Sequence, residues 1–199
     1  LIGNFDGLHS GHQKLFQLAK KYKTKYRSKI GVVTFNPIPK MFFNKKIKNY
    51  RISNFNQKVV YLKKFGVDFI INKNFDKKFS KIKCMDFIKN ILSKKLRSKF
   101  IFVSNNFRFG HRREGDVLLL KKYEHIYGYT LIKPTPLKKN RKIISSTIIR
   151  KLLEKGKLSK ANKFLKRNWE IEGTVQKGRM MGQKIGFPTC NIDIENYVI

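Results

Sequence analysis

The chain has 199 residues, of which 41% are hydrophobic, enough for one full domain and part of another. It has no run of about 18 apolar residues and no basic leader before an apolar stretch, so we expect neither a membrane span nor export. It has only two cysteines, so we expect a reducing cytoplasm and no disulfide framework. The net charge of +34 is spread over almost every segment of a chain that is also rich in Asn, Ile, Phe and Tyr, as a genome rich in A/T codons would produce, so we expect no specific nucleic-acid partner.

Short apolar stretches alternate with helical patterns along the chain. The expected strands are 30–35, 68–71, 100–103 and 129–132, and the expected helices are 12–27, 56–65, 85–97, 116–127 and 146–155. Asp116 and either Ser145 or Ser146 are suited to cap helices, while Gly128 and Gly156 are suited to end them. Strands that alternate with helices predict an α/β fold with a parallel sheet, whose ligands bind beyond the carboxyl ends of the strands.

The first thirteen residues, LIGNFDGLHSGHQ, join the end of a strand to a glycine-rich turn and a helix start. Gly3, Gly7 and Gly11 permit backbone conformations and close approaches that side chains would block. His9 and His12 are three residues apart, so both imidazoles share one helix face beside unpaired N–H groups. This pattern favours a phosphate site, although it is not a Walker A loop. A zinc site is a weaker alternative because no metal-ligand spacing recurs.

A second group of polar residues begins a later helix. Ser145, Ser146 and Thr147 supply hydroxyl groups, and Arg150 lies one turn further along. These residues can be a helix cap and a solvated charge. Together with the histidine turn they predict a second anion site, because a guanidinium group suits bidentate contacts with phosphate.

The pattern changes between residues 165 and 169. Residues 169–175 alternate between apolar and polar side chains, which predicts the first strand of a different unit. We therefore divide the chain into a domain at 1–165 and a fragment of a second domain at 166–199.

Five segments, taken in order, resemble the bacterial bifunctional riboflavin kinase/FMN adenylyltransferase family. They are 3–13 (GNFDGLHSGHQ), 34–39 (TFNPIP), 106–110 (NFRFG), 144–150 (ISSTIIR) and 186–191 (GFPTCN). The first contains the HxGH signature of the wider nucleotidyltransferase superfamily. The resemblance implies a Rossmann-like nucleotidyltransferase domain followed by the start of a β-barrel riboflavin kinase domain. It also implies an enzyme that transfers the AMP moiety of ATP to FMN, giving FAD and pyrophosphate.

The resemblance also implies roles for individual residues. His9, His12 and Arg150 would be catalytic, because the reaction depends on positioning and on donors and cations around the developing charge. Mg²⁺ would bridge phosphate oxygens, with most of its ligands supplied by the nucleotide and water. The residues expected to bind ATP are Gly3, Phe5, Gly7, His9, Gly11, His12, Ser145, Ser146, Thr147 and Arg150.

The expected flavin site is the loop that holds Asn106, Phe107, Arg108 and Phe109. The two aromatic rings can flank a planar isoalloxazine or simply anchor the loop in the core. In the family's TFxPHP turn this chain departs from the pattern, since Asn36 replaces an acidic residue and Ile38 replaces a histidine. That departure weakens the expectation of polar contacts from the turn.

The resemblance places Thr189 and Asn191 at the PTxN positions that bind the Mg²⁺ nucleotide in the kinase domain. A closed barrel needs about a hundred residues, so we expect residues 166–199 not to fold independently and not to phosphorylate riboflavin. A longer parent would do so, and the missing initiator Met suggests that residues are also absent at the front.

Two other functions stay open at this stage. Another adenylyl- or cytidylyltransferase would share the HxGH and hydroxyl/Arg segments but should lack the FRFG-like loop and the PTxN segment. A basic, non-enzymatic RNA-binding module would explain the charge but not the histidine pair.

Overall fold

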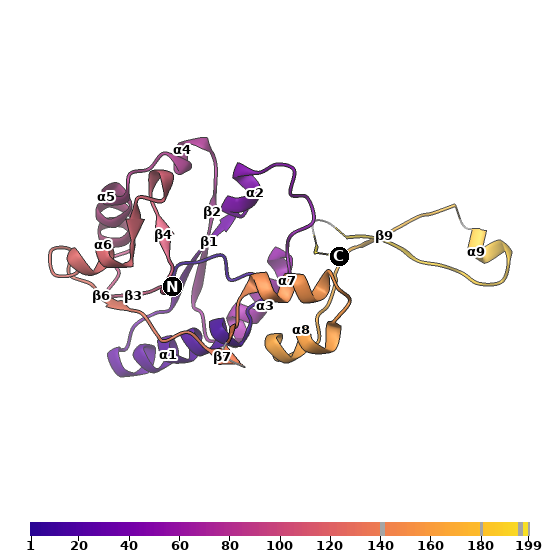
Figure 1. The fold of residues 1–199 in the computed structure, drawn as a ribbon, viewed down its shortest axis with the longest axis horizontal. Helices are drawn as coiled ribbons and strands as arrows, with labels where there is room; N and C mark the ends of the chain where they lie inside the picture. Colours follow the sequence, from indigo (N-terminus) through magenta and orange to yellow (C-terminus); the bar gives the residue numbers. More distant parts are fainter. Residues whose placement is uncertain (140–141, 180, 195–196, 199) are drawn as a thin grey trace.

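The structure is a computed structural model that describes residues 1–139, 142–179, 181–194 and 197–198. Its centre is a set of parallel strands (Figure 1). β1 (Gly31–Asn36) pairs with β2 (Phe69–Asn74), and β3 (Phe100–Phe102) pairs with β6 (Thr130–Ile132). Residues 1–3 lie between the two pairs: the Val33 N–H donates to Leu1 O at 2.9 Å, and the Ile2 N–H donates to Phe102 O at 3.2 Å. The spatial order is therefore β2, β1, residues 1–3, β3, β6, the order of a doubly wound Rossmann-like sheet.

The remaining elements connect or flank these strands. The longer helices are α1 (Ser10–Tyr26), α3 (Phe55–Lys64), the π-helix that follows α5 (Phe87–Lys95), α6 (Val117–Lys122), α7 (Ser146–Leu153) and α8 (Leu158–Leu165). The shorter helices are α2 (Pro39–Phe43), α4 (Lys77–Ser80), α5 (Cys84–Asp86), a 3₁₀ turn (His111–Arg113) and α9 (Met181–Lys184). Three antiparallel pairs complete the set: β4 (Arg108–Phe109) with β5 (Gly115–Asp116), β7 (Lys138–Lys139) with β8 (Lys142–Ile143), and β9 (Thr174–Gln176) with β10 (Asn191–Asp193).

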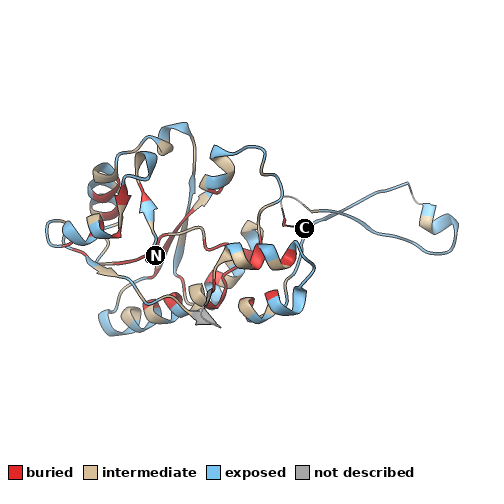
Figure 2. Ribbon diagram, in the orientation of Figure 1, coloured by how far each residue is buried: buried red, intermediate tan, exposed pale blue. Residues whose placement is uncertain are grey.

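Helices cover both faces of the sheet, so the buried residues form two layers (Figure 2). On one face α1 and α3 pack through Phe16 and Leu62 against Val32 of β1. On the other face the π-helix and α6 pack through Ile88 and Leu120 against side chains of residues 1–3, β1 and β3. Successive side chains of a strand point to opposite faces, which is why apolar runs rather than alternating patterns mark these strands in the sequence.

A third cluster joins α7 and α8 to the rest of the chain. It contains Ile149, Leu153 and Leu165 together with Ile52 and Val198. From this cluster the β9–β10 hairpin, tipped by α9, extends away from the sheet (Figure 1), and its strand residues are all exposed.

The predicted strands and helices of the first domain are confirmed, with different ends. α6 ends at Lys122, five residues before the expected end, and Gly128 lies in the left-handed region, at φ +64°, in the turn that leads to β6. Asp116 caps α6 by accepting from the Leu119 N–H at 2.8 Å, and Ser145 caps α7 through the Ile148 N–H at 3.4 Å.

The strand expected at 169–175 is wrong over its first five residues, since β9 begins only at Thr174. The reason is the anchoring of Trp169. Its indole N–H donates to Ile52 O at 2.8 Å, and its backbone N–H donates to Asn162 Oδ1 at 2.8 Å. These bonds hold this stretch against the α7–α8 cluster instead of in a sheet ladder. The domain boundary at 165/166 stays a prediction.

Candidate functional site

The glycine-rich turn lies at the carboxyl end of the strands, directly after residues 1–3. Phe5, Gly7 and Leu8 all have positive φ angles, of 45°, 76° and 38°. A Cβ on Gly7 would lie 2.7 Å from the Ile52 side chain, so this position requires glycine for both its conformation and its packing. The turn delivers the chain into α1 with His9 at the N-cap position, where its side chain makes no capping bond.

The two histidines meet as their spacing predicts. Their rings are stacked with centroids 3.7 Å apart, and the edge of Phe5 contacts His12. Burial, followed by the Arg150 charge, lowers the pKa of His9 to about 4. Burial, His9, Lys58 and Arg150, in that order, hold the pKa of His12 well below its usual range. Both imidazoles are therefore neutral at pH 7, and each offers one N–H donor and one acceptor nitrogen.

Asp6 organises the site, and the sequence analysis gave it no role. Its carboxylate is 2% exposed and accepts from the Ile52 and Ser53 N–H groups. It also forms an ion pair with Arg150 Nη2 at 2.6 Å. The sequence did hold a signal for this role, because an acidic residue within a predicted anion site needs a nearby cation such as Arg150 to balance its charge.

Arg150 and the hydroxyl residues of α7 are consequently part of the scaffold of the turn. Arg150 Nε donates to Tyr50 O at 2.7 Å, and the guanidinium lies 3.7 Å from the centroid of the Tyr50 ring. Ser146 Oγ donates to Asp6 O at 2.9 Å. Of the three predicted hydroxyls, Ser145 and Ser146 thus bond within the protein, whereas Thr147 is exposed. The structure brings the two predicted anion segments together across 144 residues of sequence.

Two further cations accompany Arg150, and sequence reasoning missed both. Lys58 of α3 is only 5% exposed, and its Nζ donates to Thr34 Oγ1 at 3.4 Å. Burial, partly offset by the Asp6 charge and reinforced by Arg51, lowers the pKa of Lys58 to about 8. In a chain with 46 Lys and Arg, nothing in the sequence separates these two from the solvated ones. The site therefore holds three cationic side chains around one carboxylate.

Buried polar atoms without a partner gather at this site. Of the seven such side-chain atoms among the described residues, five belong to it: Asn4 Oδ1, His9 Nδ1, Ser10 Oγ, His12 Nδ1 and Arg51 Nε. Buried polar groups are nearly always hydrogen-bonded in native proteins. All of these atoms except the acceptor Asn4 Oδ1 can donate a hydrogen bond, and with the surplus positive charge they suit an anionic, oxygen-rich ligand.

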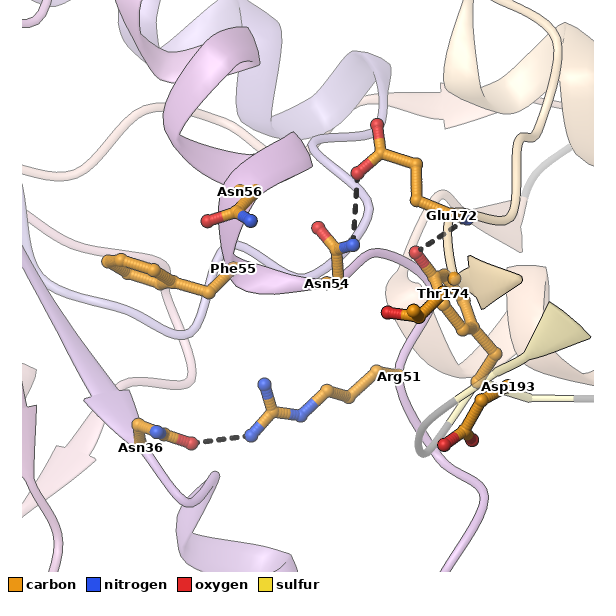
Figure 3. A pocket seen from close by; sticks show the side chains of 10 residues that line it. Asn36, Arg51, Asn54, Phe55, Asn56, Glu172, Thr174 and Asp193 are labelled. Carbon is orange, nitrogen blue, oxygen red and sulfur yellow. Dashed lines mark hydrogen bonds between the residues drawn. The ribbon is translucent and has the colours of Figure 1, made fainter. Parts of the chain in front are cut away.

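A cavity of about 740 Å³ lies beside Arg51 (Figure 3). One wall comes from Asn36 and the start of α3, and the other comes from Glu172, Thr174 and Asp193. Arg51 Nη2 donates to Asn36 Oδ1, and Asn54 Nδ2 donates across the cavity to Glu172 Oε2 at 3.0 Å. Ile38, at the position of the family's histidine, is buried and offers no polar group.

The predicted flavin loop follows β3 at the same edge of the sheet. Phe109 is 7% exposed and packs on Phe87, so its ring anchors the loop in the core. Phe107 stacks on Phe109 with ring centroids 5.5 Å apart. Arg108 pairs with Asp116 at 3.1 Å, while the exposed Asn106 accepts from Ser104 Oγ at 2.9 Å. Phe109 thus anchors the loop, and the flavin contacts expected from this loop stay a prediction.

The residues predicted for the kinase portion lie far along the β9–β10 hairpin. Thr189 and Asn191 are exposed, and a Cβ on Gly178 would lie 1.8 Å from Asn191 Nδ2. Met180, which lies between Gly178 and Gly182 in the sequence, is outside the described residues. The described residues contain no group of three or more His, Cys, Asp or Glu side chains placed to hold a metal, so the zinc alternative finds no support there. No helix in the described part of the chain is long and apolar enough to cross a bilayer.

Known proteins resemble this chain over almost its whole length. A bifunctional riboflavin kinase/FMN adenylyltransferase of Buchnera aphidicola subsp. Acyrthosiphon pisum is 42% identical, over 96% of this chain and 61% of its own length. The protein of that name from Escherichia coli K12 is 36% identical, over 99% and 63%. A solved structure from Streptococcus pneumoniae, described as a macrolide-efflux protein, has a TM-score of 0.81 at 30% identity and covers 97% of this chain and 63% of its own.

The chain thus spans about 61 to 64% of the length of the curated relatives it matches. Residues 165–199 match the riboflavin kinase family. Residues 1–148, which carry the histidine turn and the start of α7, match FAD synthetase. The chain therefore belongs to the FAD synthetase family.

Proposed function

We propose that this protein transfers the AMP moiety of ATP to FMN, forming FAD and releasing pyrophosphate. The observation that carries the proposal is the cluster of five buried, unpaired polar atoms beside three cations at the carboxyl end of the sheet. A triphosphate supplies the negative charge and the oxygen acceptors that the donors among these atoms lack. The family match and the names of the relatives add the flavin as the acceptor.

The chemistry proceeds without a covalent enzyme intermediate. An oxygen of the FMN phosphate attacks the α-phosphorus of ATP in line, the bond to the bridging β-phosphate oxygen breaks, and pyrophosphate leaves with that electron pair. His9 and His12 are neutral and act as N–H donors to phosphate oxygens, and the backbone N–H groups that begin α1, which no side chain caps, offer further donors. Arg150, held by Asp6, supplies fixed positive charge.

The proposed nucleotide site does not offer a cage of carboxylates for Mg²⁺. Asp6 is occupied by two backbone N–H groups and by Arg150. We therefore propose that Mg²⁺ binds through the phosphate oxygens of ATP, where it would neutralise developing charge. In the riboflavin kinase portion, Thr189 and Asn191 are proposed to contribute oxygen ligands, since both side chains are exposed and carry the donors that Mg²⁺ prefers.

For FMN we propose a position along the edge between the histidine turn and the loop that holds Asn106 and Arg108. Both segments follow adjacent strands, so their ends lie side by side. Because Phe109 is buried, the contacts to the flavin come from Asn106, Arg108 and the outer side of Phe107.

The test incubates the purified protein with Mg²⁺, ATP and either FMN or riboflavin and resolves the flavins by chromatography. We expect FAD from FMN, and a rate at least 100-fold lower in His12→Asn, since one donor to developing charge is worth about 10²–10³ in rate. His125→Asn, which changes an exposed histidine, is the matched control. The same assay on the product of the complete reading frame separates an incomplete chain from a wrong substrate.

Two results would redirect the proposal. Turnover of CTP or of a phosphorylated acceptor other than FMN, with FMN inert, would identify a different nucleotidyltransferase. Salt-sensitive binding of RNA without any nucleotide turnover would favour the RNA-binding alternative.

A further inference from the structure

Lys58 is the buried charge that the scaffold leaves without an ionic partner. It lies in α3, where a capping box between Asn54 and Gln57 fixes the first turn directly before it. Its one hydrogen bond, to Thr34 Oγ1, is long at 3.4 Å. In the described part of the chain no carboxylate oxygen lies within ion-pair distance of its Nζ. The helix thus holds an ammonium group in the interior without an ion pair of its own among the described residues.

The charges around Lys58 compensate its burial only in part. Asp6 is the nearby acid, but its carboxylate is already bound to Arg150 and to two backbone N–H groups. Arg51 adds a second positive charge, and the Lys58 charge itself contributes to the low pKa of His12. Leaving a buried ion unpaired is among the more costly arrangements in a protein. An apolar side chain would serve the fold better at this position.

We propose that Lys58 is a catalytic residue of the adenylyl transfer, with its ammonium group bound to the α-phosphate of the nucleotide. This inference rests on the proposed function. Thr34 Oγ1, which accepts from Lys58 Nζ, donates in turn to Asn4 O at 3.3 Å, so the ammonium lies beside the turn that carries His9 and His12. Lys58 transfers no proton. It stabilises the charge on the non-bridging oxygens while the bond from the FMN phosphate forms and the bond to the β-phosphate oxygen breaks.

The ammonium differs from the guanidinium of Arg150 in what it is free to do. Arg150 uses Nε and Nη2 for Tyr50 and Asp6, so much of its hydrogen-bonding capacity serves the fold. Lys58 uses one weak bond and keeps two N–H donors for a ligand. At neutral pH its depressed pKa still leaves most of the group protonated, and it loses its charge above about pH 8.

The test compares Lys58→Met with Lys63→Met, which removes an exposed lysine of the same helix. Three quantities are measured for each variant: kcat and KM for FAD formation, the thermal midpoint without ligand, and the midpoint shift caused by inorganic tripolyphosphate. We expect Lys58→Met to lower kcat at least 100-fold with less than a tenfold change in KM. Its midpoint without ligand should equal or exceed that of the unmodified protein, and its shift with tripolyphosphate should shrink. Lys63→Met should match the unmodified protein in all three.

A purely structural lysine that supports Thr34 gives a different result. In that case Lys58→Met lowers the midpoint and leaves kcat or the tripolyphosphate shift unchanged, and the inference is overturned. The tripolyphosphate measurement does not depend on flavin. If the unmodified protein makes no FAD, the proposed function fails, while a tripolyphosphate shift that is lost only in Lys58→Met still assigns Lys58 to phosphate binding.

A pH profile provides a second test. The rate of the unmodified protein should fall above about pH 8, where the Lys58 ammonium loses its proton. The charged and titratable groups around it are Asp6, Arg51 and His12. Lys58→Arg keeps its charge at every working pH, so the alkaline decline should move upward in that variant. A decline at the same pH in Lys58→Arg argues that another group titrates.

Discussion

The substitution Asp6→Asn tests the charge arrangement at the centre of the site. The asparagine keeps an oxygen that can accept from the Ile52 and Ser53 N–H groups. It removes the negative charge that compensates Arg150, whose side chain is buried and bound to Asp6 at 2.6 Å. The site then contains three cations and no anion, so the change isolates the electrostatic contribution of the carboxylate.

The expected loss of stability follows from the burial of the pair. Breaking a buried ion pair by removing one partner costs about 3–5 kcal/mol. For a chain of this size each kcal/mol lowers the midpoint by about 2–4 °C, so the thermal midpoint should fall by about 6–20 °C. The matched control is Asp86→Asn, which changes an exposed carboxylate that accepts one bond from Asn90 and should alter stability by about 0.5 kcal/mol or less.

The assay is urea unfolding at pH 7, followed by far-UV circular dichroism. It is applied to Asp6→Asn, to Arg150→Met and to the double variant that combines them. Arg150→Met removes the positive charge that Asp6→Asn leaves unpaired. The double variant should therefore lose less free energy of unfolding than the two single losses added together, by about 0.5–3 kcal/mol. A loss below about 1 kcal/mol in Asp6→Asn, or strictly additive effects, would refute the view that this pair holds the turn to α7.

Three further outcomes follow from the same geometry. Gly7→Ala should lower the free energy of unfolding more than Gly128→Ala does. Both positions have positive φ, which costs alanine about 1–2 kcal/mol, but only at Gly7 would the new Cβ also meet a neighbour, the Ile52 side chain. Equal losses in urea unfolding would contradict this. Asn54→Ala should cost about 1 kcal/mol in free energy of unfolding, since it removes the N-cap of α3. A thermal midpoint equal to that of the unmodified protein would contradict this. The free energy of unfolding should fall as pH drops from about 6.5 to about 4, because the unfolded chain binds protons there that buried His9 and His12 do not. The share of His9 is about 1.4 kcal/mol per pH unit, so an unchanged slope in His9→Asn would show that His9 has no part in it.

Local patterns in the sequence predicted the main strands and helices up to α7, but not α8 (Leu158–Leu165). Apolar runs marked β1 and β3, whose side chains are mostly buried inside the sheet. Asp116 and Ser145 marked helix starts because their side chains accept from backbone N–H groups three residues on. The expected strand at 169–175 was wrong over its first five residues for the opposite reason. The side chain of Trp169 makes a contact with Ile52 that no local pattern contains.

The sequence by itself determined the histidine pair, since two residues three apart at the start of a helix must share a face, and it determined the glycine turn that precedes them. Only the tertiary structure decided which charges face that pair. Asp6 neutralises Arg150 across 144 residues of sequence, and α3 brings Lys58 inside while dozens of other basic residues stay in solvent. Charge neutralisation and desolvation depend on distance and burial in the folded chain, and neither quantity is encoded in the spacing of residues along it.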